Sequence, residues 1–191
     1  MQVILASQSP RRRELLARFP FSFDIKIADI DETMDGDADP ADEVARVSCK
    51  KAQAISRTPE DVVIAADTVV VCDGRVLGKP RDPQEATQML ELLSGRAHQV
   101  MTGLTVLHGD RCVSVTEITD VFFRPLTQSE IRRYVGSKEP MDKAGSYAIQ
   151  GGAALFVEKI SGDYFNVVGL PVCRLGQLLR QIAPQLLEDE T

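Results

Sequence analysis

Apolar runs alternate with amphipathic stretches along the chain, and the runs predict strands. Residues 2–6 read QVILA, and residues 62–72 read VVIAADTVVVC, a β-branched run that is apolar at almost every position. Runs that are apolar on both faces are typical of strands buried inside a sheet. We therefore expect a short buried strand at 2–6 and a central strand or strand pair at 62–72. Further strands are expected at 21–28, 98–108, 112–124, 153–159 and 164–168, with 98–108 and 112–124 paired as a hairpin.

Three helices are predicted to begin at a capping side chain followed by proline, at Ser9–Pro10, Asp39–Pro40 and Asp82–Pro83. The capping side chain can accept a hydrogen bond from the first turn, and proline suits the first helical position. An acidic loop at 29–42 and a glycine-rich loop at 142–152 are also expected. The expected helices cover residues 10–19, 40–56, 83–94, 127–136 and 171–182. Because strands and helices alternate, we expect an α/β fold with a mixed sheet.

The size and charge of the chain limit the classes of function. A length of 191 residues fits one domain, or one domain with a small lobe. Hydrophobic residues make up 43% of the chain, which is enough to bury a core. The net charge of -6 argues against nucleic-acid and anionic-membrane partners, because both need a broad cationic face. An anionic ligand must then be bound by a local basic cluster.

The cysteines and histidines do not indicate a structural metal site. The four cysteines and two histidines are scattered, without the spacing of zinc ligands. Reduced thiols fit this scatter better than a disulfide framework. The N-terminal sequence places a short apolar run before its charges, the reverse of a signal peptide. Since no stretch approaches the roughly 18 apolar residues that span a bilayer, we expect a cytoplasmic protein.

The segment Ser7–Arg12 reads SQSPRR and joins the first predicted strand to a helix N-terminus. Free N–H groups and the helix dipole favour an anion at such a junction. At about 100° per residue, Arg12 falls near the centre of the core-facing side and Arg11 at its edge, whereas Arg13 points away. Arg11 and Arg12 are therefore candidate ligand contacts. The alternative is a capped helix with surface arginines.

Two charged residues interrupt apolar patterns. Lys51 lies on the apolar stripe of the predicted helix 40–56, where it needs a partner or must extend to solvent. Asp67 lies between two apolar runs, and a buried carboxylate is costly without a cation, a metal or a proton. Asp67 is thus a candidate general base, with a strand-end turn aspartate as the alternative. Thr68 beside it is either a ligand contact or an ordinary strand residue.

Lys79, Gln150 and Glu32 carry weaker signals. Lys79 lies between a glycine and a proline in the sequence LGKP, which suits a phosphate contact. Gln150 lies near the end of the glycine-rich loop, and its amide offers a donor and an acceptor that can read the edge of a base. The alternative for this segment is a flexible glycine loop. Taken alone, Glu32 is a solvated residue of the acidic loop.

Four sequence blocks together resemble the Maf nucleotide pyrophosphatases of the Maf/Ham1-like group. They are LASQSPRRRELL at 5–16, AADTVVV at 65–71, LGKPRDPQEATQMLELLSG at 77–95 and DKAGSYAIQGGAALFVEKISGDYFNVVGLP at 142–171. The blocks occur in order and span nearly the full length. The resemblance implies a single domain over residues 1–191, with an elongated mixed sheet, flanking helices and two lobes around a central cleft.

The resemblance also implies hydrolysis of a nucleoside triphosphate to the monophosphate and pyrophosphate, with Mg²⁺ or Mn²⁺. Asp67 matches the proposed proton acceptor of the family, and Glu32 and Asp67 match its metal positions. The phosphate-binding positions of the family match Ser9, Arg11, Arg12, Lys51 and Lys79. The positions associated with substrate choice match Arg11, Thr68 and Gln150.

The glycine-rich loop resembles that of the dTTP/UTP branch of the family. The expected substrates are therefore dTTP and UTP, with modified pyrimidine triphosphates as further candidates. Two alternatives stay open: a 7-methyl-GTP pyrophosphatase of the same family, and a non-catalytic nucleotide-binding regulator of septum formation. The family resemblance also implies a homodimer. A serine hydrolase is not supported, because the chain has no GxSxG turn.

Overall fold

The computed structural model of the chain describes residues 1–188. Within it the chain forms two compact units. The first unit comprises Met1–Asp67, Thr102–Glu117 and the segment from Gly169 onward, and the second comprises Thr68–Met101 and Ile118–Val168. The single domain expected over residues 1–191 includes residues 189–191, which lie outside the described part of the chain.

Seven strands form one mixed sheet, which confirms the expected α/β class. The strand order is β2-β1-β3-β5-β6-β7, with β4 paired to β3. Strand β1 is parallel to both β2 and β3, whereas β4 is antiparallel to β3 and β7 is antiparallel to β6. The strands are β1 Val3–Ala6, β2 Asp24–Lys26, β3 Val62–Cys72, β4 Arg75–Leu77, β5 Ala97–His108, β6 Arg111–Phe123 and β7 Val157–Ser161.

Side-chain caps begin the helices where the sequence predicts them. Ser9, Asp39 and Asp82 each accept a hydrogen bond from the first turn of the helix that follows. Thr127 and Glu130 form a capping box at the next helix. The helices are α1 Pro10–Leu16, α2 Pro40–Gln53, α3 Pro83–Leu93, α4 Gln128–Gly136, α5 Tyr164–Val168 and α6 Val172–Ile182, with short 3₁₀ turns η1 Glu139–Asp142, η2 Ala144–Ser146, η3 Gly152–Leu155 and η4 Pro184–Leu186.

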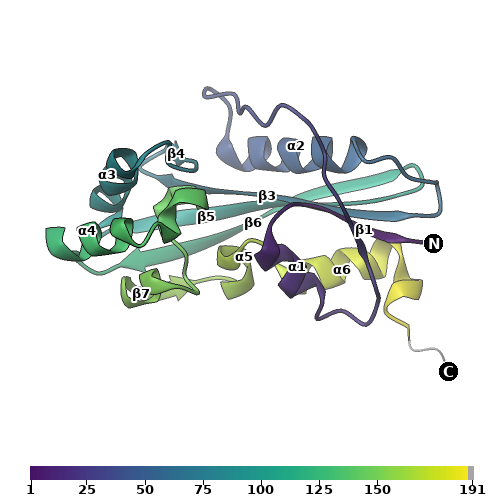
Figure 1. Ribbon diagram of the computed structural model, residues 1–191. Coiled ribbons are helices and arrows are strands. Elements are labelled where there is room, and N and C mark those ends of the chain that lie inside the picture. The colour runs from purple at the N-terminus through teal and green to yellow at the C-terminus, as the bar shows by residue number, and fades with distance from the viewer. Residues whose placement is uncertain (189–191) are drawn as a thin grey trace. The chain divides into compact units, whose positions relative to one another are not determined.

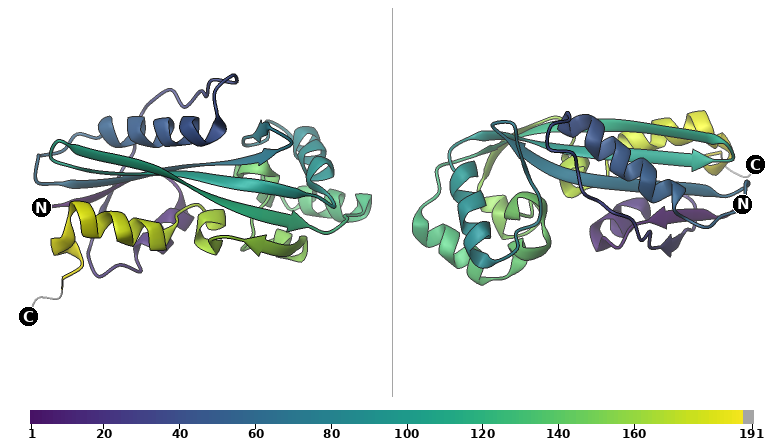
Figure 2. Two further views of the ribbon diagram at one scale, coloured as in Figure 1. Left: turned by 180° about the vertical axis from the view of Figure 1, so that it is seen from behind. Right: turned by 90° about the horizontal axis from the view of Figure 1, so that it is seen from above.

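In the first unit, helices cover both faces of the sheet. Helix α2 lies on one face, and α1 and α6 lie on the other (Figure 1 and Figure 2). Ala52 of α2 and Val63 of β3 belong to one buried apolar cluster. Gly103 of β5 permits the close approach of α2, because a Cβ there would lie 2.1 Å from the backbone oxygen of Val44. Helix α2, which carries Lys51, is therefore seated directly on the sheet.

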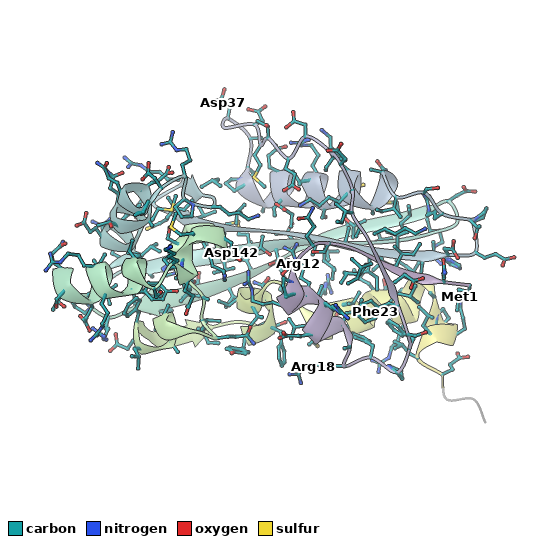
Figure 3. All side chains as sticks on the ribbon, viewed as in Figure 1. Met1, Arg12, Arg18, Phe23, Asp37 and Asp142 are labelled. Carbon is teal, nitrogen blue, oxygen red and sulfur yellow. The ribbon has the colours of Figure 1, made fainter. Side chains whose placement is uncertain are left out.

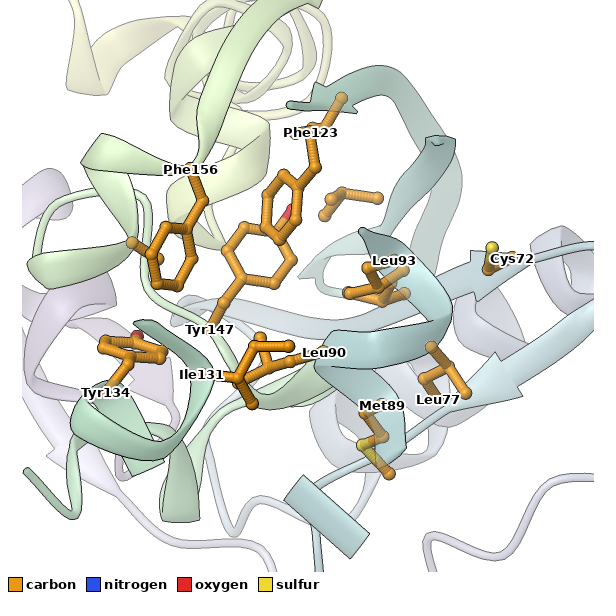
Figure 4. Packing of buried hydrophobic residues seen from close by; sticks show 14 residues of the cluster. Cys72, Leu77, Met89, Leu90, Leu93, Phe123, Ile131, Tyr134, Tyr147 and Phe156 are labelled. Carbon is orange, nitrogen blue, oxygen red and sulfur yellow. The ribbon is translucent and has the colours of Figure 1, made fainter. Parts of the chain in front are cut away.

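The second unit has an aromatic core. Figure 4 shows the rings of Phe123, Tyr134, Tyr147 and Phe156 gathered beside the apolar side chains of α3. The ring centroids lie 4.9 Å apart for Phe123 and Tyr147, 6.0 Å for Phe123 and Phe156, and 5.1 Å for Tyr134 and Phe156, all in edge-to-face contacts. Because two of the four rings carry a hydroxyl group, this core also supplies hydrogen-bonding groups next to the glycine-rich loop.

The expected strands at 153–159 and 164–168 are wrong in different ways. Residues 164–168 form the helix α5, and β7 begins only at Val157, after the turn η3. The Asp163 carboxylate accepts a hydrogen bond from the Phe165 N–H at 2.7 Å, as a helix cap does. Periodicity alone does not distinguish a strand from a helix in so short an apolar run.

Several element ends also differ from expectation. Strand β2 has three residues where 21–28 is predicted, and α2 ends at Gln53 rather than at residue 56. The segment after the Asp73–Gly74 turn forms the short strand β4, which the sequence pattern does not reveal. No helix among residues 1–188 combines the length and apolar character of a membrane crossing. The central cleft stays a prediction.

Candidate active site

The junction of β1 and α1 is a polar turn held by serine hydroxyls. Ser7 Oγ accepts a hydrogen bond from the Ser9 N–H at 3.2 Å, and Ser9 Oγ accepts one from the Arg12 N–H at 3.5 Å. Ser9 has the extended backbone of an N-cap, and Pro10 occupies the first helical position. This geometry confirms the predicted cap and fixes where the arginines of α1 begin.

Arg12 folds back over this turn. Its Nε donates to the carbonyl oxygen of Gly169 at 2.8 Å, and its Nη1 donates to Ser7 Oγ at 3.3 Å. Burial lowers the pKa of the Arg12 guanidinium, and the negative charge of Asp67 opposes that shift. Arg12 is half-buried whereas Arg13 is exposed, as the helical geometry predicts. Figure 3 shows Arg12 near the start of α1.

Lys51 joins two carboxylates. Its Nζ lies 2.7 Å from Asp67 Oδ1 and 3.0 Å from Glu32 Oε2. The side chains of Lys51 and Asp67 are only 10% and 13% exposed, whereas that of Glu32 is 56% exposed. The apolar stripe of α2 therefore directs Lys51 towards the carboxylate of β3. Lys51 and Asp67 are thus the partners that the sequence pattern required. Glu32 reaches the same ammonium group from the acidic loop.

The first unit thus assembles five charged residues, which we call the cation–carboxylate cluster: Arg11, Arg12, Lys51, Glu32 and Asp67. The charges of Arg11, Glu32 and Asp67 all act on Arg12. The cluster contains three cations and two carboxylates, so it keeps a small excess of positive charge. In a partly buried setting this excess favours an anionic ligand.

Three further candidates, Thr68, Lys79 and Gln150, belong to the second unit. Lys79 is exposed and follows β4, and the neighbouring Gly78 carbonyl accepts a hydrogen bond from the Gly145 N–H at 3.1 Å. This bond ties the Lys79 turn to the glycine-rich loop. Thr68 follows Asp67 in β3 and is half-buried.

Gln150 lies at the tip of a turn in the glycine-rich loop. The Gly151 N–H donates to the Ala148 carbonyl at 3.0 Å, which closes the turn around it. Its side chain is exposed, so the amide is open to a ligand. The 3₁₀ turns η2 and η3 flank this tip, so part of the loop has regular backbone structure.

The two carboxylates of the cluster fit a divalent cation. Glu32 and Asp67 both reach Lys51 Nζ, so their oxygens converge on one small region, and Mg²⁺ and Mn²⁺ take oxygen ligands. Residues 1–188 contain no group of three or more His, Cys, Asp or Glu side chains that could hold a metal ion. Mg²⁺ is commonly held by one or two carboxylates together with substrate phosphates. The donor set therefore fits an ion that binds together with a phosphorylated substrate.

The sequence reasoning missed several contacts around these residues. Ser7 and the Gly169 carbonyl both hold Arg12; the sequence places Ser7 in the polar turn but gives no sign of its bond to Arg12, and nothing local marks Gly169. Tyr134 and Glu139 hold the glycine-rich loop, although their segment has only the signals of a surface helix and its exit. Only the tertiary structure brings these groups together.

The chain is similar over most of its length to known proteins. A family model described as Maf-like protein matches residues 2–182. The chain is 52% identical to a dTTP/UTP pyrophosphatase of Bacillus pumilus (strain SAFR-032) over 93% of this chain and 95% of the relative. It is 48% identical to a dTTP/UTP pyrophosphatase of Bacillus cytotoxicus, over 93% and 94% of the two chains.

A solved structure of a HAM1 protein from Coxiella burnetii is 15% identical, with a TM-score of 0.46 over 95% of this chain and 99% of that one. The family model and the two relatives each match far more than half of the chain. The protein described here therefore belongs to the Maf-like family.

Proposed function

We propose that this chain is a nucleoside triphosphate pyrophosphatase that hydrolyses dTTP and UTP to the monophosphate and pyrophosphate. The observation that carries the proposal is the contact of the partly buried Asp67 with Lys51, 2.7 Å away, inside a cluster with excess positive charge. The substrate assignment is supported by relatives at 52% and 48% identity that are named dTTP/UTP pyrophosphatases.

The cations are proposed to bind the phosphates. A triphosphate carries about four negative charges, so several cations must converge on it. Arg11, Arg12 and Lys51 supply three positive charges from the first unit, and Ser9 adds a hydroxyl group at the start of α1. Lys79, which is exposed, is proposed as a further phosphate contact. A phosphate that binds Lys51 competes with the two carboxylates for the same ammonium group.

Glu32 and Asp67 are proposed to hold Mg²⁺ or Mn²⁺. Both ions take oxygen ligands, which the two carboxylates supply. When bound, the ion would neutralise charge on the phosphates and polarise a phosphate oxygen. The role of the chain is to present two carboxylates that are already oriented by one lysine. Asp67, the less exposed of the two, also stays close enough to the phosphate-binding cations to act in the reaction.

Asp67 is proposed as the proton acceptor. It would take a proton from a water molecule whose oxygen forms a new bond to the α-phosphorus, while the bond from that phosphorus to the bridging oxygen breaks. Pyrophosphate then leaves with the electron pair of that bond, and Arg11, Arg12 and Lys51 offset its charge. Positioning and electrostatics supply most of this catalysis, as in phosphoryl transfer generally.

Gln150, Thr68 and Arg11 are proposed to select the substrate. Thymine and uracil present an acceptor–donor–acceptor edge, and an amide complements two neighbouring positions of that edge. Gln150 is exposed at the tip of its turn, where it can meet a base. Thr68 and Arg11 are included because they match the family positions associated with substrate choice.

The remaining assignments are also proposals. The two units act as one pyrophosphatase domain over residues 1–191, of which the last three lie outside the described part. The protein works in the cytoplasm on free nucleotides, without a nucleic-acid or membrane partner, and forms a homodimer. A single cooperative unfolding transition would support the single domain, and a dimer mass in solution would support the homodimer.

The test is product analysis across nucleotides. The protein is incubated with Mg²⁺ or Mn²⁺ and dTTP, UTP, CTP, GTP, ATP or 7-methyl-GTP, and the products are identified by ³¹P NMR. We expect pyrophosphate and the monophosphate from dTTP and UTP. Activity on 7-methyl-GTP alone would overturn the substrate assignment within the family. Binding without release from any nucleotide would contradict the enzyme and favour a nucleotide-binding regulator.

A further inference from the structure

A hydrogen-bond network holds the loop on both sides of Gln150. Tyr134 on α4 donates its hydroxyl proton to Glu139 Oε1 at 2.8 Å and accepts the Ala148 N–H at 3.0 Å. The Glu139 carboxylate also accepts the Gly152 N–H, at 3.1 Å to Oε1 and 3.2 Å to Oε2. The same Tyr–Glu pair therefore fixes the backbone two residues before and two residues after Gln150.

The glycines of this loop make room for the carboxylate. A Cβ on Gly151 would lie 2.1 Å from Glu139 Oε1, and one on Gly152 would lie 3.2 Å from the ring of Tyr134. Both values are below ordinary van der Waals separation, so only residues without a side chain let the backbone approach this pair so closely. The glycines that suggested flexibility in the sequence thus serve a tight contact.

The hydrogen bond between Tyr134 and Glu139 persists at neutral pH. Tyr134 is 6% exposed, and burial together with the hydrogen bond to Glu139 raises its pKa well above the usual value. The phenol therefore keeps its proton at neutral pH and continues to donate to the carboxylate. Loss of Glu139 would leave the hydroxyl of the buried Tyr134 without its acceptor, which is unfavourable, and would release the exposed Gly152 N–H to solvent.

Further anchors lie at the start of the loop. The Tyr147 hydroxyl lies 2.8 Å from Nε2 of the buried His98, and the Gly145 N–H donates to Gly78. These contacts leave Gln150 as the exposed tip of a segment that is held before and after it. The Tyr134–Glu139 pair is the anchor nearest to that tip in the sequence.

We propose that Glu139, acting with Tyr134, is a positioning residue that sets the base selectivity of the enzyme by holding Gln150 in place. The inference rests on the proposed function, because it assumes that Gln150 reads the base. Glu139 does not touch the nucleotide in this account. If the loop backbone moves by about 1 Å, the side-chain amide of Gln150 is no longer aligned with the base. Displacements of that size cost up to about 100-fold in rate.

The test compares Glu139→Ala with the matched control Glu158→Ala, which removes an exposed glutamate from β7 of the same unit. For each protein, kcat/KM and Kd are measured for dTTP and CTP. We expect the dTTP-to-CTP ratio to fall by up to about tenfold in Glu139→Ala, the limit set by loss of Gln150 itself, and to stay unchanged in the control. A merely structural defect would lower kcat/KM for both substrates by the same factor and leave their ratio unchanged. That result would overturn the inference.

A second variant leaves Glu139 itself in place. Gly151→Ala puts a methyl group 2.1 Å from Oε1 of Glu139, so it should displace the carboxylate and reproduce the loss of selectivity. Hydrogen exchange reports the network without any turnover: the Ala148 and Gly152 amides should exchange faster in both variants. Unchanged exchange at both amides would contradict the network as the anchor.

A double-mutant cycle with Gln150→Ala separates this inference from the proposed function. If Glu139 acts through Gln150, Glu139→Ala should have no further effect on the ratio in the Gln150→Ala background. A full additional effect there would overturn the inference while leaving the enzyme intact. If the wild-type protein releases no pyrophosphate, the proposed function fails, and the dTTP-to-CTP ratio of Kd values decides the positioning role by the same criteria.

Discussion

The cation–carboxylate cluster and the Gln150 loop are organised in opposite ways. In the cluster, the candidate functional groups contact one another, with Lys51 held by Asp67 and Glu32. In the loop, the contacts fall on the backbone of Ala148 and Gly152, and the side chain of Gln150 remains exposed. Charged groups can hold each other, whereas a group that must stay open to a ligand has to be positioned through its neighbours.

The two regions should respond differently to mutation. A change within the cluster alters the charge balance, the packing and the chemistry together, because the same contacts serve all three. A change around the loop alters the direction of one amide and leaves the charges in place. We therefore expect large, substrate-independent effects in the first region and smaller, substrate-dependent effects in the second.

The largest effect is expected from Asp67→Asn. The amide cannot accept the proton of the attacking water, and general bases typically contribute about 10²- to 10⁴-fold, so kcat should fall by that factor for every nucleotide. Steady-state pyrophosphate release measures it. The matched control is Asp73→Asn at the exposed turn after β3, where asparagine tolerates the positive φ of 49°. Near-normal turnover in Asp67→Asn would contradict its role as the proton acceptor.

Lys51→Met should lower kcat/KM for all nucleotides by about 100-fold, because the proposed phosphate contact and the orientation of Asp67 would both be lost. It should also destabilise the fold by about 1–3 kcal/mol, since the partly buried Asp67 loses its hydrogen-bonded cation. Adding Asp67→Asn should restore much of that stability but no activity.

Denaturant unfolding and pyrophosphate release measure these two effects separately. Lys50→Met, an exposed neighbour on the same helix, is the control and should leave both nearly unchanged. A Lys51→Met protein that keeps full activity would mean that the lysine is only a structural partner of Asp67.

Gln150→Ala should lower the preference for dTTP over CTP by about tenfold while changing kcat for the remaining reaction little. Loss of a hydrogen bond to a base edge is typically worth about 1–2 kcal/mol, which corresponds to this factor. Gln128→Ala, on α4 of the same unit, removes an exposed glutamine that bonds to Glu91 and serves as the control. A dTTP preference that survives Gln150→Ala would remove this residue from substrate selection.

The smallest effect concerns the anchor of the loop at His98. Burial lowers the pKa of His98 from 6.5 to about 4. Below pH 6.5 the unfolded chain therefore binds a proton at His98 that the folded protein does not bind. The contribution of His98 to the free energy of unfolding is thus fully present above pH 6.5 and is lost as the pH drops towards 4. Between pH 6.5 and 5.5 the free energy of unfolding should fall by about 1 kcal/mol.

Urea unfolding at several pH values measures this slope. His98→Gln should flatten it in that window. His108→Gln, which leaves the His98–Tyr147 pair in place, is measured beside it as the control. An unchanged slope in His98→Gln would show that another group is responsible.

The residues that break a pattern are the ones that the sequence predicts best. Lys51 and Asp67 stand out because a charge inside an apolar stripe or strand needs a partner, and the structure places each beside the other. The Ser9 cap and the inward orientation of Arg12 follow from local geometry in the same way. Local rules suffice where the partner lies within one helical turn or where burial forces a pairing.

Other contacts could not be predicted, because they depend on chain segments that only the fold brings together. Glu32 is an ordinary residue of an acidic loop until that loop reaches Lys51. Glu139 lies 13 positions from Gly152, and nothing in its surroundings marks a contact with the loop. The sequence pattern predicts a strand where the structure has helix α5, because five residues are too few for periodicity to distinguish the two.

The most direct test of the two-region account is a table of kcat/KM values for dTTP, UTP, CTP and GTP with Asp67→Asn and Gln150→Ala side by side. The account predicts that Asp67→Asn lowers all four values by one common factor and that Gln150→Ala changes their ratios. If Asp67→Asn altered the ratios, or Gln150→Ala lowered all four values equally, the division between phosphate chemistry and base reading would be wrong.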